Sequence, residues 1–92
     1  MDFTWDPKKA VANIKKHSVS FEEAVTVFYD PLAKITDDPD HSKDEDRFIL
    51  IGYSRTNSLL FVVHVYRERN EIVHIISARK ATKKEKKDFK EL

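Results

Sequence analysis

The candidates for chemistry on a phosphate in this chain of 92 residues are His17, Arg47 and Arg79. Histidine titrates nearest to neutral pH and can give or take a proton, whereas arginine holds two phosphate oxygens with its planar fork. His17 lies at the expected end of a helix, where the helix dipole favours a cation, so it suits a proton donor or a phosphate contact better than a base. The alternatives are a histidine that only caps the helix and, for Arg47, an ion pair with Glu45 or Asp46.

Lysines near these residues extend the positive charge. Residues 79–92 hold seven basic and three acidic side chains, and residues 37–46 hold one basic and six acidic, so the net charge of +1 hides two charged segments. A basic segment can bind a polyanion or an acidic protein partner. The alternative is a solvated helix face that binds no ligand. Because Arg79 and Lys80 are neighbours at the end of a strand, they should point to opposite faces. The phosphate-binding candidates are Lys16, Lys80, Lys83 and Lys84.

The composition excludes several kinds of site. The chain has no cysteine, which rules out disulfides and thiolate metal sites, and its one glycine rules out glycine-rich phosphate loops. The acidic segment fails the EF-hand pattern, because no glycine occupies the sixth place counted from Asp38 and Ile49 stands at the twelfth. We therefore expect no metal and no other cofactor. The longest apolar run, Leu59 to Val63, is too short for a membrane helix, and residues 1–20 lack a signal-peptide stretch, so we expect a cytoplasmic protein.

Two helices are expected before residue 31. The first runs from Pro7 to His17 after the cap residue Asp6. The second begins after the capping box of Ser20 and Glu23 and ends at Asp30-Pro31. The short joint between them makes a helical hairpin or corner. The residues expected to face the core are Ala10, Val11, Ile14, Phe21, Ala24, Val25 and Phe28.

After Pro31 the pattern changes from helix to strand. The expected strands are residues 32–36, 47–53, 59–66 and 71–78. Asn57 and Asn70 lie in the short connections between the last three strands and tolerate a positive φ, which favours an antiparallel meander. The uninterrupted apolar run from Leu59 is typical of a central strand covered on both faces.

A last helix follows the capping box of Thr82 and Glu85. Its only large apolar residues are Phe89 and Leu92, so it should gain little from packing. His64 and His74 fall inside expected strands, where a structural role is the simpler interpretation. The sequence thus predicts a single α+β domain over residues 1–92.

Three segments, in this order, resemble the BrnT family of bacterial type II toxin-antitoxin systems. They are WDPKKAVANIKKHSVSFEEAVTVFYDPLA, DDPDHSKDEDRFILIGYS and IISARKATKKEKKDF. The resemblance implies a RelE-like fold with two N-terminal helices and a C-terminal helix packed on an antiparallel sheet. It also implies a metal-independent ribonuclease that arrests growth. The partner it implies is a BrnA-like ribbon-helix-helix antitoxin, which would form a hetero-oligomer with the toxin and alone contact operator DNA.

If the chain cleaves RNA, His17, Arg47 and Arg79 are the catalytic candidates, since the reaction needs proton carriers and cations around the phosphate. Two departures from the family pattern stand out. Ser18 replaces a glycine, and a positive φ there would cost on the order of 1 kcal/mol. Phe89 replaces a tyrosine and lacks its hydroxyl. The alternative functions are a non-catalytic antitoxin-binding module and sequence-independent nucleic-acid binding.

Overall fold

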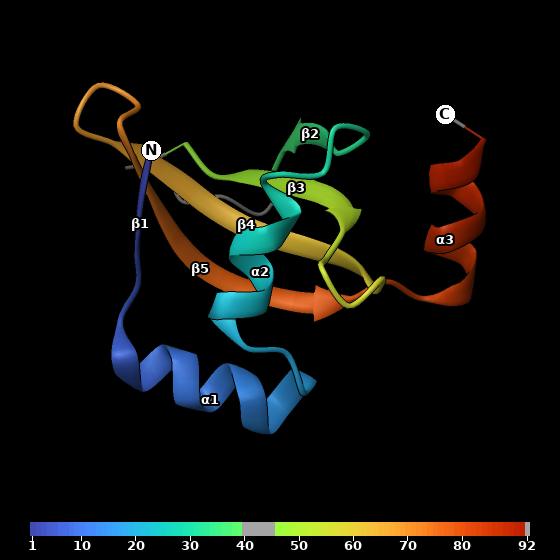
Figure 1. Cartoon of the computed structure of the whole chain (residues 1–92), viewed down its shortest axis with the longest axis horizontal. Coiled ribbons are helices and arrows are strands. Elements are labelled where there is room, and N and C mark those ends of the chain that lie inside the picture. Colours follow the sequence, from blue (N-terminus) through green and yellow to red (C-terminus); the bar gives the residue numbers. More distant parts are fainter. Residues whose placement is uncertain (40–45, 92) are drawn as a thin grey trace.

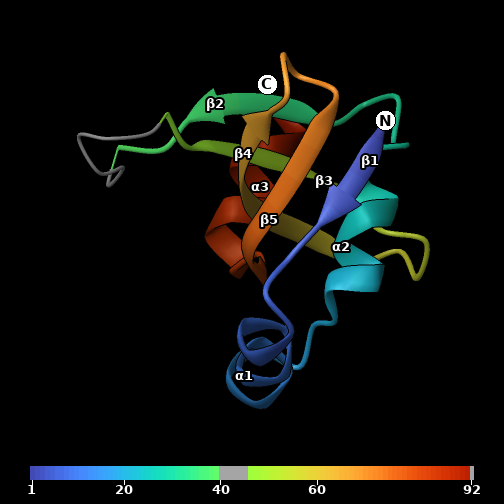
Figure 2. The same cartoon turned by 90° about the vertical axis from the view of Figure 1, so that its left-hand side faces the viewer.

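The computed structural model describes residues 1–39 and 46–91. Its elements are β1 (Asp2–Thr4), α1 (Pro7–His17), α2 (Phe21–Val27), β2 (Lys34–Asp37), β3 (Phe48–Tyr53), β4 (Leu59–Arg67), β5 (Ile72–Lys80) and α3 (Lys83–Lys90). The five strands form one sheet in the order β1-β5-β4-β3-β2, which gives an α+β fold with β4 in the middle (Figure 1). The helices α2 and α3 lie on opposite sides of this sheet (Figure 2). No helix in the described ranges has the length and apolar character to cross a membrane.

The sheet is mixed, so the prediction of a purely antiparallel sheet is wrong. Strands β2 to β5 pair antiparallel in succession, as the meander requires. The unexpected strand is β1, which pairs in parallel with β5 through Phe3 and Val73. Three residues are too few to show a periodic pattern, so β1 could not be predicted from its residues. The next strand, β2, starts at Lys34 rather than at residue 32, because Ala33 donates its N–H to Asp30 in a turn.

The core lies between α2 and one face of the sheet. Phe21 and Val27 of α2 pack in one cluster with Leu60 and Val62 of β4, and all four are fully buried. Burying such side chains contributes about 1.5–3 kcal/mol each. On the opposite face of β4, Phe61 is only half-buried, so the predicted coverage of both faces is incomplete.

The helix α1 turns a different face to the sheet than its apolar pattern predicts. Val11 and Ile14 are 55% and 49% exposed, whereas Asn13 is only 6% exposed. The Asn13 amide nitrogen donates to the carbonyl oxygens of Val19 at 2.9 Å and Ala78 at 2.8 Å. Its oxygen accepts the Ala78 N–H at 3.1 Å. A polar residue therefore anchors the helix, which hydropathy cannot reveal.

This anchor completes the sheet where β1 stops. The pairing of β1 with β5 ends at His74, and farther along β5 the Asn13 amide bonds both the N–H and the C=O of Ala78. Backbone N–H and C=O groups at the edge of a sheet reduce the stability of the fold when they are buried without a hydrogen-bond partner. The Asn13 side chain thus takes the place of a neighbouring strand.

The turn after α1 confirms the expectation for Ser18. This residue has φ 58° and ψ 31°, in the left-handed region, and its N–H bonds to the Ile14 carbonyl. The left-handed region is also used by Asn57 and Asn70 in the two hairpin connections. Asparagine tolerates this conformation better than most residues, as predicted.

Replacing Asn13 with alanine should lower the free energy of unfolding by about 2–4 kcal/mol, because three hydrogen bonds are lost and the Ala78 N–H is left buried without a partner. Urea denaturation measures this change, with Val11→Ala as the control on the exposed face of the same helix. Equal, small effects for the two variants would contradict the anchoring role.

Candidate nucleic-acid interface

Three elements bring most of the predicted site residues to one end of the molecule. The bonds between Asn13 and Ala78 set α1 beside β5. His17 lies about 6 Å beyond this joint along α1, and Lys80 lies about 7 Å beyond it along β5. Both elements run toward the side where α3 begins (Figure 1). We call this region the basic end; it consists of Lys16, His17, Arg79, Lys80, Lys83 and Lys84.

The lysines of the basic end are exposed. Lys16, Lys80 and Lys83 project from three different elements, whereas His17 is half-buried at the end of α1. Lys84 lies 3.3 Å from Asp88, but both side chains are mostly exposed, and such a surface pair adds little stability. The basic end therefore carries several solvated lysines on three different elements.

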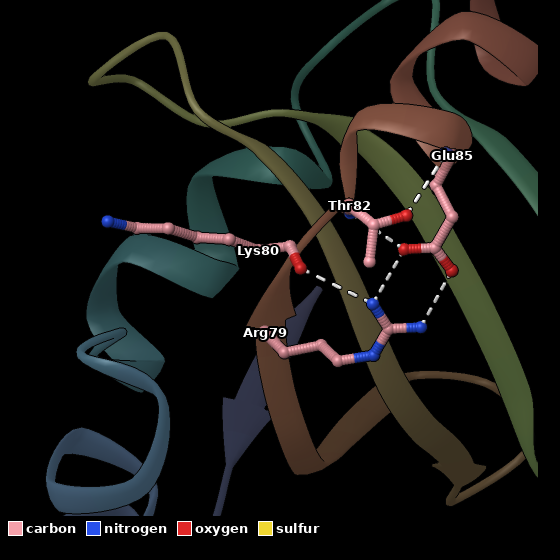
Figure 3. Close-up of polar contacts among 4 residues, drawn as sticks. All are labelled: Arg79, Lys80, Thr82 and Glu85. Carbon is pink, nitrogen blue, oxygen red and sulfur yellow. Dashed lines mark hydrogen bonds and ion pairs between the residues drawn. The ribbon is translucent and has the colours of Figure 1, made fainter.

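Arg79 is held in place by an acidic partner. Its Nη1 and Nη2 lie 2.8 and 2.9 Å from the two carboxylate oxygens of Glu85, as Figure 3 shows. Nη1 also donates to the Lys80 carbonyl at 3.3 Å, and the guanidinium lies 4.4 Å from the centre of the Phe61 ring. The hydrogen bonds that Arg79 donates to Glu85 raise the pKa of Arg79. In this structure Arg79 therefore connects β5 to α3. A phosphate would have to replace the Glu85 carboxylate to bind both Nη groups of the Arg79 guanidinium.

Glu85 serves two elements at once. Besides pairing with Arg79, it accepts the Thr82 N–H at 2.9 Å, while the Thr82 hydroxyl accepts the Glu85 N–H at 3.1 Å. The predicted capping box is thus present. The hydrogen bond from Arg79, helped by the bond from Thr82, lowers the pKa of the Glu85 carboxyl to about 2. The capping pattern predicts only the cap role of Glu85; its pairing with Arg79 could have been inferred from its place six residues after an arginine at a strand end.

Lys80 extends away from Arg79, toward the opposite side of the strand (Figure 3). This direction follows from strand alternation and agrees with the prediction for the two neighbours. Only Arg79 therefore faces α3 at this position.

The structure does not bring Arg47 to the basic end. Arg79 pairs with Phe61, and Phe61 pairs with Ile51 of β3. Arg47 precedes Ile51 by four residues, which places it about 13 Å along the strands and about 10 Å across two strand spacings from Arg79. It lines a separate hollow with Asp37 and Asp46. The acidic residues 40–45, with His41 and Glu45, lie outside the described residues.

The helix α3 packs more firmly than its sequence predicts. The Phe89 ring lies 6.0 Å from the Tyr53 ring in a T-shaped contact, and Lys34 Nζ lies 5.3 Å from the centre of the Phe89 ring. Such aromatic and cation–π contacts contribute about 0.5–1.5 kcal/mol each. Phe89, which stands where the family pattern has tyrosine, has a packing role here.

Comparison with known proteins identifies the family. The model of the family described as "Ribonuclease toxin, BrnT, of type II toxin-antitoxin system" matches residues 5–85. The chain belongs to the BrnT family. The crystal structure of the Brucella abortus ribonuclease toxin BrnT superposes with a TM-score of 0.69 at 25% identity, covering 90% of this chain and 99% of that one. The search of curated proteins gives no match.

The family match includes the residues that build the basic end of this BrnT chain. It extends from Trp5 to Glu85 and so contains α1, β5 and the ion pair of Arg79 with Glu85. The rest of α3, including Phe89, lies after the matched range. The part of the chain that resembles the family is therefore the part that carries the candidate site.

Replacing Glu85 with glutamine should destabilise the protein near neutral pH, and this difference should disappear in acid. The folded carboxyl has a pKa of about 2, below the ordinary value of about 4.3 in the unfolded chain. Its stabilising contribution is therefore complete above about pH 4.3 and is lost as the pH falls through 2. Thermal unfolding of both proteins between pH 7 and 2 measures the difference.

Asp88→Asn is the control for this experiment, because it removes an exposed carboxylate from the same helix. A difference between the native protein and Glu85→Gln that stays constant down to pH 2, or is absent at pH 7, would contradict the role of the ion pair.

Proposed function

We propose that this chain is a metal-independent endoribonuclease that inhibits translation and growth by cutting RNA, and that a ribbon-helix-helix antitoxin neutralises it. Membership of the BrnT family supports the ribonuclease class. The observation on which the proposal rests is the composition of the basic end, where α1 and β5 end and α3 begins and each of the three elements carries exposed cations, with His17 on α1. These side chains supply positive charge and a proton carrier of the kind that metal-free RNA cleavage needs.

The proposed reaction is an attack of the ribose 2′-oxygen on the adjacent phosphorus. A new P–O bond forms, the bond from phosphorus to the 5′-oxygen breaks, and the products carry a 2′,3′-cyclic phosphate and a 5′-hydroxyl. The proton of the 2′-hydroxyl leaves to solvent, and His17 gives a proton to the departing 5′-oxygen. A histidine at a helix C-terminus suits this role.

The cations have distinct roles in this proposal. Lys16 and Lys80 contact the phosphate that reacts, and Lys83 and Lys84 contact its neighbours along the RNA. Arg79, on the opposite side of β5 from Lys80, contacts a different phosphate of the RNA when that phosphate takes the place of Glu85, because guanidinium binds phosphate and carboxylate in the same two-pronged way. Arg47, at the other end of β3, lies outside this group.

The purified chain should cleave RNA in the presence of EDTA and leave an RNA analogue without 2′-hydroxyls intact, since the nucleophile is then missing. His17→Asn should slow cleavage by about 10²–10⁴-fold, the usual contribution of a positioned proton carrier. His74→Asn is the matched control, because His74 bonds Thr4 at the β1 edge, away from the basic end. Gel analysis of end-labelled RNA gives the rates and the product termini.

Expression of the chain alone should arrest growth, and co-expression with the antitoxin should restore it. Cleavage that continues in His17→Asn would remove the assignment of His17. Absence of both cleavage and growth arrest, with antitoxin binding retained, would support the alternative of a non-catalytic antitoxin-binding and co-repressor module.

A further inference from the structure

A hollow of about 460 Å³ lies between α3 and the sheet edge that β2 and β3 form. Its lining consists of Leu32, Lys34, Tyr53, Phe89 and Lys90. Lys34 is the first residue of β2, Tyr53 is the last residue of β3, and Phe89 and Lys90 end α3. We call this site the ring hollow. The proposed cleavage step does not use it.

Two aromatic rings give the ring hollow an apolar wall. The Tyr53 and Phe89 rings meet at an interplanar angle of 75°, and both side chains are half-buried, so part of each ring faces solvent. Leu32 is 71% exposed beside them. Proteins that bind single-stranded nucleic acids stack bases on exposed rings of this kind. The wall therefore suits a flat, apolar group.

The described lining of the ring hollow is positively charged. It contains the two lysines Lys34 and Lys90 and no carboxylate. The neighbouring Asp30 accepts the Leu32 N–H at 3.0 Å and the Tyr53 N–H at 2.7 Å, so both of its oxygens bond to the main chain. A ligand that matches this lining has a flat ring and a negative charge, as a nucleotide does. A neutral apolar side chain would match the rings but not the lysines.

The ring hollow lies at the same end of the sheet as the basic end. The strand ends at Tyr53 and Lys80 pair with two consecutive residues of β4. The helix α3 connects the two sites, because it runs about 10 Å from Lys83 in the basic end to Lys90 in the ring hollow. An RNA strand whose phosphates lie at the start of α3 can therefore reach the ring hollow by following this helix.

We propose that the ring hollow binds one base of the RNA, at a fixed distance along the strand from the cut. The base stacks on Tyr53 and Phe89, and the phosphate of the same nucleotide lies at Lys90. This inference rests on the proposed function for the RNA substrate. It adds a subsite, separate from His17, that affects which sequences the protein binds.

An NMR titration of the ¹³C-labelled chain with adenosine 5′-monophosphate tests this inference, since a purine offers a large ring face. The nucleotide should shift the ring resonances of Tyr53 and Phe89, and its base protons should give intermolecular NOEs to these rings. Adenosine should bind more weakly because it lacks the phosphate. Ribose 5-phosphate, which lacks the base, should have a Kd at least about fivefold higher.

Two pairs of variants assign the binding to the ring hollow. Lys90→Gln should raise the Kd for adenosine 5′-monophosphate by about twofold to fivefold, the effect of one exposed ion pair. Lys87→Gln is its control and should leave the Kd unchanged, because Lys87 is exposed on the side of α3 opposite to Phe89. Tyr53→Leu should raise the Kd at least about fivefold, and Tyr53→Phe, which keeps the ring, should not.

Four outcomes would overturn the inference. They are nucleotide shifts centred elsewhere, ribose 5-phosphate that binds as tightly as the nucleotide, equal effects of Lys90→Gln and Lys87→Gln, and preferential binding of N-acetylleucine amide in the ring hollow, which would indicate a site for a protein partner. The NOEs of the native chain keep the test valid if Tyr53→Leu loosens α3.

RNA cleavage separates this inference from the proposed function. Tyr53→Leu should raise the KM for RNA and leave kcat unchanged, because the ring hollow lies away from His17. Nucleotide binding in the ring hollow without RNA cleavage would refute only the ribonuclease proposal. Cleavage with no nucleotide binding there, and with the KM unchanged in Tyr53→Leu, would refute only this inference.

Discussion

The hydrogen bonds between Asn13 and Ala78 are the contact on which the basic end depends. They satisfy the backbone N–H and C=O of Ala78, which lies on β5 beyond the last residue that pairs with β1. They thereby set the position of α1 along β5. A buried amide that makes these bonds specifies one relative position of helix and strand, whereas an apolar contact would tolerate sliding. His17 and Lys80 come to the same end of the molecule because the two elements are joined in this register.

The ion pair of Arg79 with Glu85 makes the second joint of the basic end. It connects the last residues of β5 to the first turn of α3, and the same carboxylate caps that turn. The pair is neutral, so the remaining cations of the basic end are the lysines and not Arg79. It also means that the arginine with the most suitable geometry for phosphate already has an anionic partner, which RNA must displace to use it.

Much of the fold could be predicted from local signals, because capping boxes, an Asp-Pro start and asparagine turns act within a few residues. The helix α1 was predicted with its observed bounds, Pro7–His17. Features that depend on distant partners could not be predicted in this way. The buried role of Asn13 requires knowing that β1 is short, and the separation of Arg47 from Arg79 follows from the pairing register of β3, β4 and β5. The spacing of candidate residues along a chain does not determine their distance across a sheet.

We infer that RNA binds where α1 and β5 end and α3 begins. An NMR titration of the ¹⁵N-labelled chain with a short 2′-O-methyl oligonucleotide, which lacks the nucleophile and stays intact, tests it most directly. We expect amide shifts concentrated at residues 15–18 and 79–84 that weaken as the salt concentration rises. Shifts concentrated at Arg47 and Phe48, with the basic end unaffected, would contradict it.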